Sequence, residues 1–192
     1  MNVGVDEAGR GCVFGPVYAA AVIWNNEITH DFLKDSKTVT KKRREYMNDF
    51  IKENALDYSV AFATSKEVDE KNILQATQLA MHRALDGLRI DFDTINVDGN
   101  YFNTYYSNNA EEYKSHNCII KGDSKFIEIS AASILAKVAH DEYICSIADQ
   151  YSVYNLQQNM GYCTKYHIEA IKAYGRTFEH RHTFKMPYEK NM

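Results

Sequence analysis

Short runs of β-branched and aromatic residues, each bounded by polar or glycine-containing stretches, predict several strands along this chain. One run, PVYAAAVIW at residues 16–24, is apolar at both alternating sets of positions. A strand of this kind is typical of a sheet that is covered on both faces. The predicted strands are residues 2–7, 17–24, 57–64, 94–98 and 117–121.

Apolar residues at helical spacing predict helices between and after these strands. Thr164 can cap the start of the last helix and Gly175 can end it, because threonine accepts from free amides and glycine leaves a helix without strain. The predicted helices are residues 40–54, 66–72, 73–88, 126–151 and 164–174.

The order of these elements predicts an α/β fold built on one mixed sheet. Strands come early in succession and then alternate with helices, which indicates an antiparallel meander followed by parallel crossovers. The chain has 192 residues and shows no internal repeat, low-complexity tract or linker. We therefore expect residues 1–192 to form a single domain.

The composition is that of an ordinary globular protein, with 45% hydrophobic and 25% charged residues. The chain begins directly in a strand pattern, without the basic and apolar regions of a secretory signal. No apolar run approaches the roughly 20 residues that span a bilayer, so no membrane association is expected. The cytoplasm is the expected compartment, where the scattered cysteines would be reduced thiols rather than disulfides or zinc ligands. They are Cys12, Cys118, Cys145 and Cys163.

Positive charge gathers in two segments although the net charge is −4. Residues 34–45 hold six Lys or Arg against two acids, and residues 161–192 hold six against three. Two basic segments around an acidic centre fit a phosphodiester substrate that is gripped at its flanks. The alternative is that both are solvated helix faces. We expect the basic C-terminal segment, about residues 161–192, to pack near the substrate site.

Histidines next to charged residues offer two further candidates. The HRH cluster of His180, Arg181 and His182 lacks partner ligands at a spacing that would bind zinc. Contact with a duplex backbone, or a solvated tail, is its expected role. His140 and Asp141 are adjacent on a predicted helix and are not expected to face each other. Asp141 is expected to support the site by contacting its residues rather than the substrate.

Four acids stand at the ends of strands or in the turn before the long helix. Asp6 and Glu7 close the first strand, Asp98 closes the fourth, and Asp123 lies in a KGDSK turn. Parallel strands end at one edge of a sheet, so if the first and fourth strands are parallel neighbours, Asp6 and Asp98 are predicted to lie about 5 Å apart. Oxygen ligands so placed suit hard divalent cations. Crowded carboxylates also repel each other, which predicts raised pKa values and weak metal binding without substrate.

Each acid also has a structural alternative. Asp123 could cap the long helix, and Asp98 before Gly99 could be an ordinary turn residue. Asp6 and Glu7 are harder to explain this way, because two charges at the end of an apolar strand are costly unless paired or metal-bound. Adjacent strand residues point to opposite faces, so Asp6 and Glu7 can converge only if the strand is already twisting out at the glycines that follow, and we expect that departure.

A glycine turn, Gly9-Arg10-Gly11, follows the first acids directly. Glycine lets backbone amides approach a ligand closely, so the turn is a candidate for binding a phosphate or a sugar. It is not a dinucleotide-binding fingerprint, because that motif opens a helix and a strand is predicted here.

The chain resembles a type 2 ribonuclease H, or ribonuclease HII, in seven segments that keep the family's order and cover nearly the whole sequence. This resemblance implies a ribonuclease H-like fold, a five-stranded mixed sheet flanked by helices. The matching segments are DEAGRG (6–11), FGPVYAAAVI (14–23), DSK (35–37), VDGN (97–100), KGDSK (121–125), ISAASILAKVAHD (129–141) and GYCTKYH (161–167).

The resemblance also implies an activity. It predicts an endoribonuclease that cuts the RNA strand of RNA–DNA hybrids, and single ribonucleotides embedded in duplex DNA, on the 5′ side of the ribonucleotide. Hydrolysis would use two ions of Mg²⁺ or Mn²⁺ and leave 3′-hydroxyl and 5′-phosphate ends. The implied partners are the hybrid and the ribonucleotide-containing duplex. A monomer is expected, and no protein partner is indicated.

The resemblance assigns roles residue by residue. The backbone of Gly9, Arg10 and Gly11 matches the motif that reads the ribose 2′-hydroxyl. Tyr162 matches the tyrosine that contacts the sugar of the following deoxynucleotide, and Lys37 matches a lysine placed for a phosphate contact. The family's catalytic, metal-binding acids match Asp6, Glu7, Asp98 and Asp123.

Two positions depart from the family pattern, since Cys12 and Cys163 stand where prolines are usual. Cys163 would loosen Tyr162 and weaken the preference for an RNA-to-DNA junction, which leaves a broader hybrid-degrading nuclease as the alternative. Arg10 separates the chain from type 3 relatives, which generally carry a different residue there and an additional N-terminal domain. A catalytically silent nucleic-acid-binding module is a third candidate, although such a module has no need for four gathered acids.

Overall fold

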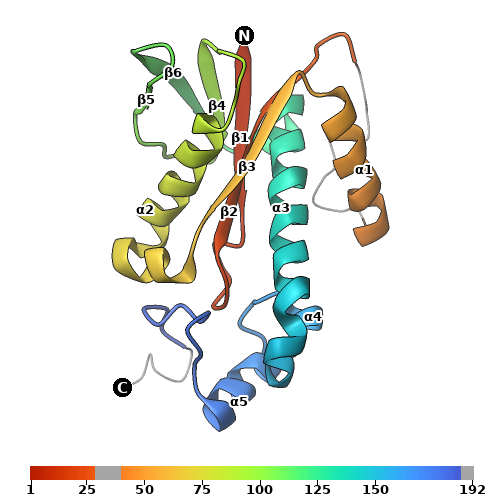
Figure 1. The fold of residues 1–192 in the computed structure, drawn as a ribbon, viewed down its shortest axis with the longest axis vertical. Coiled ribbons are helices and arrows are strands. Elements are labelled where there is room, and N and C mark those ends of the chain that lie inside the picture. The colour runs from red at the N-terminus through yellow and green to blue at the C-terminus, as the bar shows by residue number, and fades with distance from the viewer. Residues whose placement is uncertain (29–39, 187–192) are drawn as a thin grey trace.

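A mixed sheet of six strands forms the centre of the molecule (Figure 1). The computed structural model describes residues 1–28 and 40–186. Within these residues the strands lie in the order β3-β2-β1-β4-β6-β5. Their bounds are β1 (Asn2–Ala8), β2 (Val17–Ile23), β3 (Asp57–Ala63), β4 (Thr94–Asp98), β5 (Tyr105–Ser107) and β6 (Glu112–Ile119).

Strand directions follow the prediction from the element order. β1, β2 and β3 pair antiparallel as a meander, whereas β4 pairs parallel with both β1 and β6. The described sheet has six strands rather than the expected five because the short edge strand β5 adds an antiparallel partner to β6. β6 also begins at Glu112 instead of residue 117, in a stretch that is largely exposed and therefore carries no apolar alternation.

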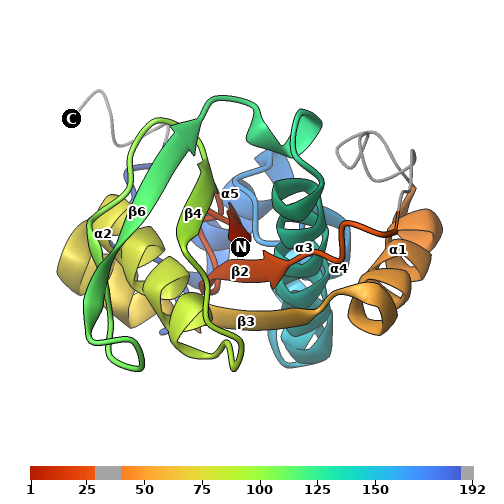
Figure 2. The same cartoon turned by 90° about the horizontal axis from the view of Figure 1, so that it is seen from above.

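Helices cover both faces of the sheet, as Figure 2 shows from above. α2 lies on one face and α3 on the other, with α1 outside α3, while α4 and α5 lie beyond one end of the sheet. None of the helices in the described residues is long and apolar enough to cross a membrane. The helices are α1 (Lys41–Asn54), α2 (Ser65–Asp86), α3 (Ile127–Ile147), α4 (Leu156–Asn159) and α5 (Lys165–Tyr174), with 3₁₀ turns η2 (Gly122–Ser124) and η3 (Ala148–Tyr154).

Local signals in the sequence set the helix boundaries. α2 is broken at Asn72, whose backbone has a φ of 67°, so the prediction of two separate helical segments here is confirmed. The Asn72 side chain accepts from the amide of Gln75 at 3.1 Å and caps the second segment. Thr164 caps α5 and Gly175 ends it, as predicted.

Alternation along β1 divides the core between the two faces of the sheet. Val3 and Val5 pack with α2, whereas Ala8 packs with α3. Gly4 lies on the α3 side, where a Cβ atom would stand 2.2 Å from the backbone of Glu128. The missing side chain lets the start of α3 rest directly on β1, which fixes where the rest of that helix meets the strand.

The loop after β1 is held by the C-terminal part of the described chain. Cys12 forms a β-bridge with Tyr162, and Phe14 forms another with His180. The Phe14 ring is fully buried in a core cluster that it shares with η3, α4 and α5. Residues 161–186 therefore pack against the loop that carries the glycine turn.

Glu67 stabilises the start of α2 through its charge. Its carboxylate pairs with Arg83 at 2.7 Å and accepts from the Thr64 amide at 2.9 Å, and the bonds from Arg83 lower its pKa to about 2. Glu67→Gln is expected to lower the free energy of unfolding by about 1 kcal/mol at neutral pH. A carboxyl with a lowered pKa stabilises the fold above its ordinary pKa, so the difference should fade as the pH falls from 4.5 toward about 2. Urea titrations across this range measure the effect; an equal difference at every pH would contradict the role of the charge.

Candidate active site

The first two candidate acids lie at the end of β1, next to α3. Asp6 is almost fully buried and accepts hydrogen bonds from the hydroxyl of Ser133 on α3 and, at 2.8 Å, from the amide of Glu7. Glu7 is partly buried, and its carboxylate pairs with Arg10 at 3.2 Å. Because α3 rests on Gly4 at its start, its next turn brings Ser133 to Asp6.

Asp98 reaches the same place from β4. β1 and β4 are paired up to Val5 and Val97, so the two aspartates are the next residues along each strand. The Asp98 carboxylate accepts from the amide of Gly122 at 2.7 Å, which holds it against the turn after β6. The parallel register therefore brings Asp6 and Asp98 together.

Electrostatic repulsion within this group is visible in its pKa values. Burial raises the pKa of Asp6 well above its ordinary range, and the charges of Glu7 and Asp98 raise it further. Burial also raises the pKa of Glu7, with a smaller contribution from Asp98, while Arg10 acts in the opposite direction. The predicted rise is thus confirmed for these two acids. A cation bound beside them would relieve the repulsion.

β1 ends at Ala8, directly before Gly9, so the strand leaves the sheet where the glycines begin, and the two acids still lie within it. The strand stays paired with β2 through Asp6, Glu7 and Ala8. Only the pairing with β4, on the other side, ends before the acids. Both carboxylates lie within electrostatic reach of Asp98.

Asp123 stands one residue beyond this group. It is buried in η2, directly after Gly122, whose amide binds Asp98. It does not cap α3, because the residue before that helix is Phe126. In residues 1–28 and 40–186, no three His, Cys, Asp or Glu side chains meet closely enough to hold a metal ion. The first three acids are gathered, but they do not form a closed metal cage.

The glycine turn is fixed from within the protein. Gly9 has a φ of 86°, and a Cβ atom there would lie 2.5 Å from the His140 ring. Arg181 is completely buried and donates to the carbonyls of Arg10 at 3.0 Å and Gly15 at 2.9 Å. The backbone of the turn is therefore held on its inner side, while the Arg10 side chain stays exposed.

Tyr162 lies beside the glycine turn at the edge of a cleft. Its ring is 3.6 Å from where a Cβ on Gly11 would stand, and the Lys137 ammonium of α3 lies 5.7 Å from the ring centre. Tyr162 is 39% exposed, so its ring is available to a ligand. The cleft has a volume of about 340 Å³. Its lining includes Glu7, Gly9, Arg10, Arg44, Ser133 and Lys137.

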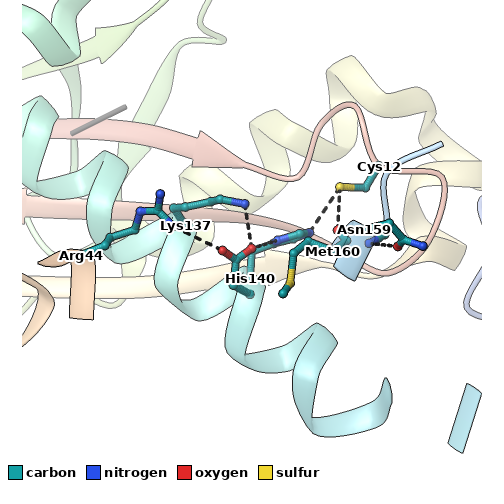
Figure 3. Close-up of polar contacts among 8 residues, drawn as sticks. Cys12, Arg44, Lys137, His140, Asn159 and Met160 are labelled. Atoms are coloured by element: carbon teal, nitrogen blue, oxygen red, sulfur yellow. Dashed lines mark hydrogen bonds and ion pairs between the residues drawn. The ribbon is translucent and has the colours of Figure 1, made fainter. Parts of the chain in front are cut away.

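A chain of polar contacts lies behind this cleft (Figure 3). Arg44 and Lys137 both bind the carboxylate of Asp141, at 3.6 and 2.7 Å. His140 contacts the same carboxylate through Nδ1 at 3.1 Å and Cys12 Sγ through Nε2 at 3.5 Å. The expectation that His140 and Asp141 do not interact is wrong, because the imidazole is buried under the glycine turn and lies back against its neighbour. Asp141 does lie behind the site, where it holds two cations at the cleft.

His180 and Arg181 of the C-terminal segment do not have the role that was expected of them. His180 and Arg181 are fully buried, so their expected contact with a duplex backbone or with solvent is wrong. They are buried because the C-terminal segment and the glycine turn share one core, in which both side chains find polar partners. His182 is exposed. Lys37 lies outside the described residues, in the range 29–39.

Two side chains that line the cleft, Ser133 and Lys137, were not singled out from the sequence, and the buried role of Arg181 was not foreseen. Ser133 and Lys137 lie one turn apart on α3, and their helical spacing could have identified them as a polar pair facing the acids. Arg181 carries no such signal, because its partners are backbone carbonyls of a distant loop. An arginine bound in this way looks like any exposed arginine in the sequence.

The donor set of the gathered acids fits a hard divalent cation. Asp6, Glu7 and Asp98 offer only carboxylate oxygens, and repulsion among them favours a bound positive charge. Mg²⁺ binds through a few carboxylates and keeps its other positions for water or substrate phosphate. An incomplete site of this kind is suited to a metal ion that arrives with the substrate.

Comparisons with known proteins agree on one family. The sequence profile of the ribonuclease HII family matches residues 3–190. Ribonuclease HII of Christiangramia forsetii is 50% identical over 183 residues, which is 95% of this chain and 89% of the relative. The ribonuclease H2 structure from Pyrococcus horikoshii OT3 is similar with a TM-score of 0.80 at 28% identity, over 99% of this chain and 97% of that one. Bst-RNase HIII in complex with Mn²⁺ has a TM-score of 0.76 at 17% identity, over 98% of this chain and 68% of that one, which shows the fold alone. The fold is thus ribonuclease H-like, as predicted.

Asp6 is expected to destabilise the metal-free protein at neutral pH. A carboxyl whose pKa is higher in the folded state binds its proton more tightly there, so stability falls as the pH rises from the ordinary to the raised pKa. Asp6→Asn should therefore raise the free energy of unfolding by at least about 1 kcal/mol at neutral pH. The gain should vanish below about pH 4, where the wild-type carboxyl is also neutral.

Denaturation with a chelator present measures this difference at each pH. Glu53→Gln, which changes an exposed acid of α1, is the matched control and should leave stability unchanged. Added Mg²⁺ should stabilise the wild type more than Asp6→Asn. A variant that is less stable than the wild type at neutral pH without metal would contradict the repulsion among these acids.

Proposed function

The chain belongs to the ribonuclease HII family of metal-dependent endoribonucleases that act on RNA–DNA hybrids, and we propose that it also cuts duplex DNA at single embedded ribonucleotides. The proposed cut lies on the 5′ side of the ribonucleotide and leaves 3′-hydroxyl and 5′-phosphate ends. The proposed catalytic unit is residues 1–192 acting as one domain in a monomer. Its free cysteines fit a reducing compartment such as the cytoplasm.

We propose that the four acids hold two divalent ions, Mg²⁺ or Mn²⁺, when substrate is bound. The ions would supply an activated water and stabilisation of the leaving oxygen of the phosphodiester. The protein buries Asp6 and keeps Glu7 and Asp98 close to it, and the resulting repulsion favours a bound cation there. The acids are Asp6, Glu7, Asp98 and Asp123.

Recognition of the ribose is proposed for the backbone of Gly9, Arg10 and Gly11. The 2′-hydroxyl both donates and accepts, so backbone groups of a fixed turn can distinguish it from a deoxyribose. Arg181 and His140 hold this turn from within, so it needs little rearrangement when a sugar arrives. Because Arg10 also pairs with Glu7, the ribose-reading turn adjoins the acids directly.

Tyr162 is proposed to contact the sugar of the deoxynucleotide that follows the ribonucleotide. Cys163 does not fix its own φ as a proline would, but bonds on both sides hold the turn. The Tyr162 amide donates to the Asn159 carbonyl, and the Tyr162 carbonyl accepts from the Thr164 amide, both at 2.9 Å. An ordered tyrosine favours incision at single ribonucleotides over the broader hybrid nuclease that the cysteine would suggest.

Phosphate contacts are proposed for the cations around the cleft. Arg44 and Lys137 share the carboxylate of Asp141, which holds both at the cleft wall. Lys37 is proposed as a further phosphate contact on the strength of the family motif. A local group of cations at the cleft suits a protein whose net charge is −4, because it attracts a phosphate backbone to the acids in particular.

The observation that carries this proposal is the meeting of three elements at one cleft: Glu7, which belongs to the group of repelling acids, the glycine turn and Tyr162. The test is incubation with Mg²⁺ or Mn²⁺ of two substrates, a duplex with one ribonucleotide and a continuous hybrid. We expect both to be cut, with the single-ribonucleotide duplex cut on the 5′ side. Cleavage of the hybrid alone would support the broader nuclease, and binding without cleavage of either would support the silent module.

Asp98→Asn is expected to abolish cleavage while leaving the fold and most duplex affinity intact. The amide keeps an oxygen for the Gly122 amide but lacks the charge that holds a cation, so kcat should fall at least about a thousandfold. Asp149→Asn, which changes an exposed acid of η3, is the control and should cleave normally. Steady-state kinetics and a duplex-binding titration measure both properties. Undiminished turnover would remove Asp98 from the catalytic group.

A further inference from the structure

We propose that His167 and His180 form a hydrogen-bonded relay of fixed direction that positions Tyr162 for the deoxyribose at an RNA-to-DNA junction. The inference rests on the role proposed above for Tyr162. Neither histidine is placed to touch substrate, because both are completely buried. They are positioning residues that act through the backbone of the tyrosine turn.

The direction of the relay is set by one backbone amide. The Thr177 amide donates to His180 Nδ1 at 2.9 Å, so this nitrogen carries no proton. His180 therefore carries its proton on Nε2 and donates it to His167 Nε2 at 3.2 Å. His167 in turn donates from Nδ1 to the Tyr162 carbonyl at 3.0 Å. Each bond fixes the tautomer of the next ring, so the tyrosine carbonyl always meets a donor.

Packing and burial keep both rings neutral and in place. Burial lowers the pKa of His167 and of His180, the latter to about 3. The His180 ring lies against Phe14 and Tyr154, with ring centres 4.9 and 4.8 Å away. If the protons of the relay were reversed, His180 Nδ1 would carry a proton. It would then face the Thr177 amide as a second buried donor, and their hydrogen bond would be lost. The relay therefore has one stable arrangement.

The tyrosine turn depends on a support from outside itself. Met160 and Gly161 have φ values of 47° and 80°, and Cys163 places no restriction on its own φ. The other bonds to the Tyr162 backbone come from Asn159 at the end of α4 and Thr164 at the start of α5, and a β-bridge with Cys12 joins the turn to the glycine loop. His167 belongs to α5 and so ties the turn to a helix. A side chain that must meet a sugar needs a backbone held to within about 0.5 Å.

The residue after His180 extends this support to the glycine turn. Arg181 donates to the carbonyls of Arg10 and Gly15, and its Nη2 is buried without a hydrogen-bond partner in the described part of the chain. Two consecutive residues thus hold the two loops that are proposed to read the ribose and the following deoxyribose. Their spacing sets the distance between these loops.

The first experiment tests the relay without any use of activity. ¹⁵N NMR of the labelled full-length protein at neutral pH reports which ring nitrogen of each histidine carries the proton. We expect a proton on Nδ1 of His167 and on Nε2 of His180. The opposite tautomer in either ring, or a charged ring, would overturn the relay whether or not the protein is a nuclease.

The second experiment tests what the relay does for substrate choice. The readout is kcat/KM for a single-ribonucleotide duplex divided by kcat/KM for a continuous hybrid. His167→Ala should lower this ratio about tenfold, mainly through kcat, because an unpaired Tyr162 carbonyl lets the turn move. His167→Asn should restore most of the ratio, since its amide can donate to that carbonyl. His167→Gln should not, because its longer side chain carries the amide toward the Nε2 position.

A control variant separates positioning from general stability. His82→Ala removes a half-buried histidine of α2 that packs on Phe102 and Tyr105, away from the tyrosine turn. It should lower the melting temperature and leave the ratio unchanged. If His167→Ala does not fold, the comparison of His167→Asn with His167→Gln carries the test.

Three outcomes would overturn the proposed positioning role. The first is a kcat/KM ratio that stays unchanged in folded His167→Ala or His167→Gln. The second is a fall of the same size in the ratio of the His82→Ala control. The third is a ratio in His167→Asn that stays as low as in His167→Ala. A wild-type protein that cuts the hybrid without any preference for the junction would also overturn it. Failure to cut either substrate would instead refute the proposed function, and the NMR result would still decide on the relay.

Discussion

Mutual repulsion among buried carboxylates is the constraint on which the rest of this molecule depends. Asp6, Glu7 and Asp98 come from two parallel strands whose pairing stops just before the acids. Gly4 lets α3 rest on β1, and the helix then closes over Asp6 and removes it from water. Burial and like charge both oppose ionisation, so the metal-free site stores unfavourable energy. In the proposed mechanism, a divalent ion that binds with a substrate phosphate would offset that energy and link catalysis to the presence of the correct duplex.

The C-terminal segment supplies a scaffold rather than a charged surface. His180 and Arg181 carry polar groups into the core, where each finds backbone or imidazole partners beneath a substrate loop. This arrangement separates two tasks. The acids stay under electrostatic strain, while the glycine turn and the tyrosine turn are held by neutral or backbone hydrogen bonds that do not depend on the metal.

Much of the fold could be read from the sequence because local signals agree with the final structure. The end of β4 at Asp98, the break of α2 at Asn72 and the cap of α5 at Thr164 follow from turn and capping chemistry alone. β5 and the start of β6 could not be found in this way, because β5 has only three residues and the start of β6 is largely exposed, so neither shows an apolar alternation that could be recognised.

The parts of the candidate site that depend on strand register could be predicted from the sequence. The parts that depend on contacts between distant side chains could not. The meeting of Asp6 with Asp98 follows from two parallel strands ending at one edge. The burial of Arg181 and the contact of His140 with Asp141 depend on distant carbonyls and on a glycine that leaves room for a ring. The end of the β1–β4 pairing before the two acids could not be predicted either, because no local signal in the sequence marks it.

A crystal structure with Mn²⁺ and a duplex carrying one ribonucleotide tests the central claim most directly, with cleavage blocked at the scissile phosphate. Anomalous scattering should locate Mn²⁺ between the carboxylates of Asp6 and Asp98, in contact with the phosphate on the 5′ side of the ribonucleotide. The same crystals grown without duplex should show weaker metal occupancy there. Metal bound elsewhere, or a scissile phosphate held far from these two carboxylates, would contradict the account.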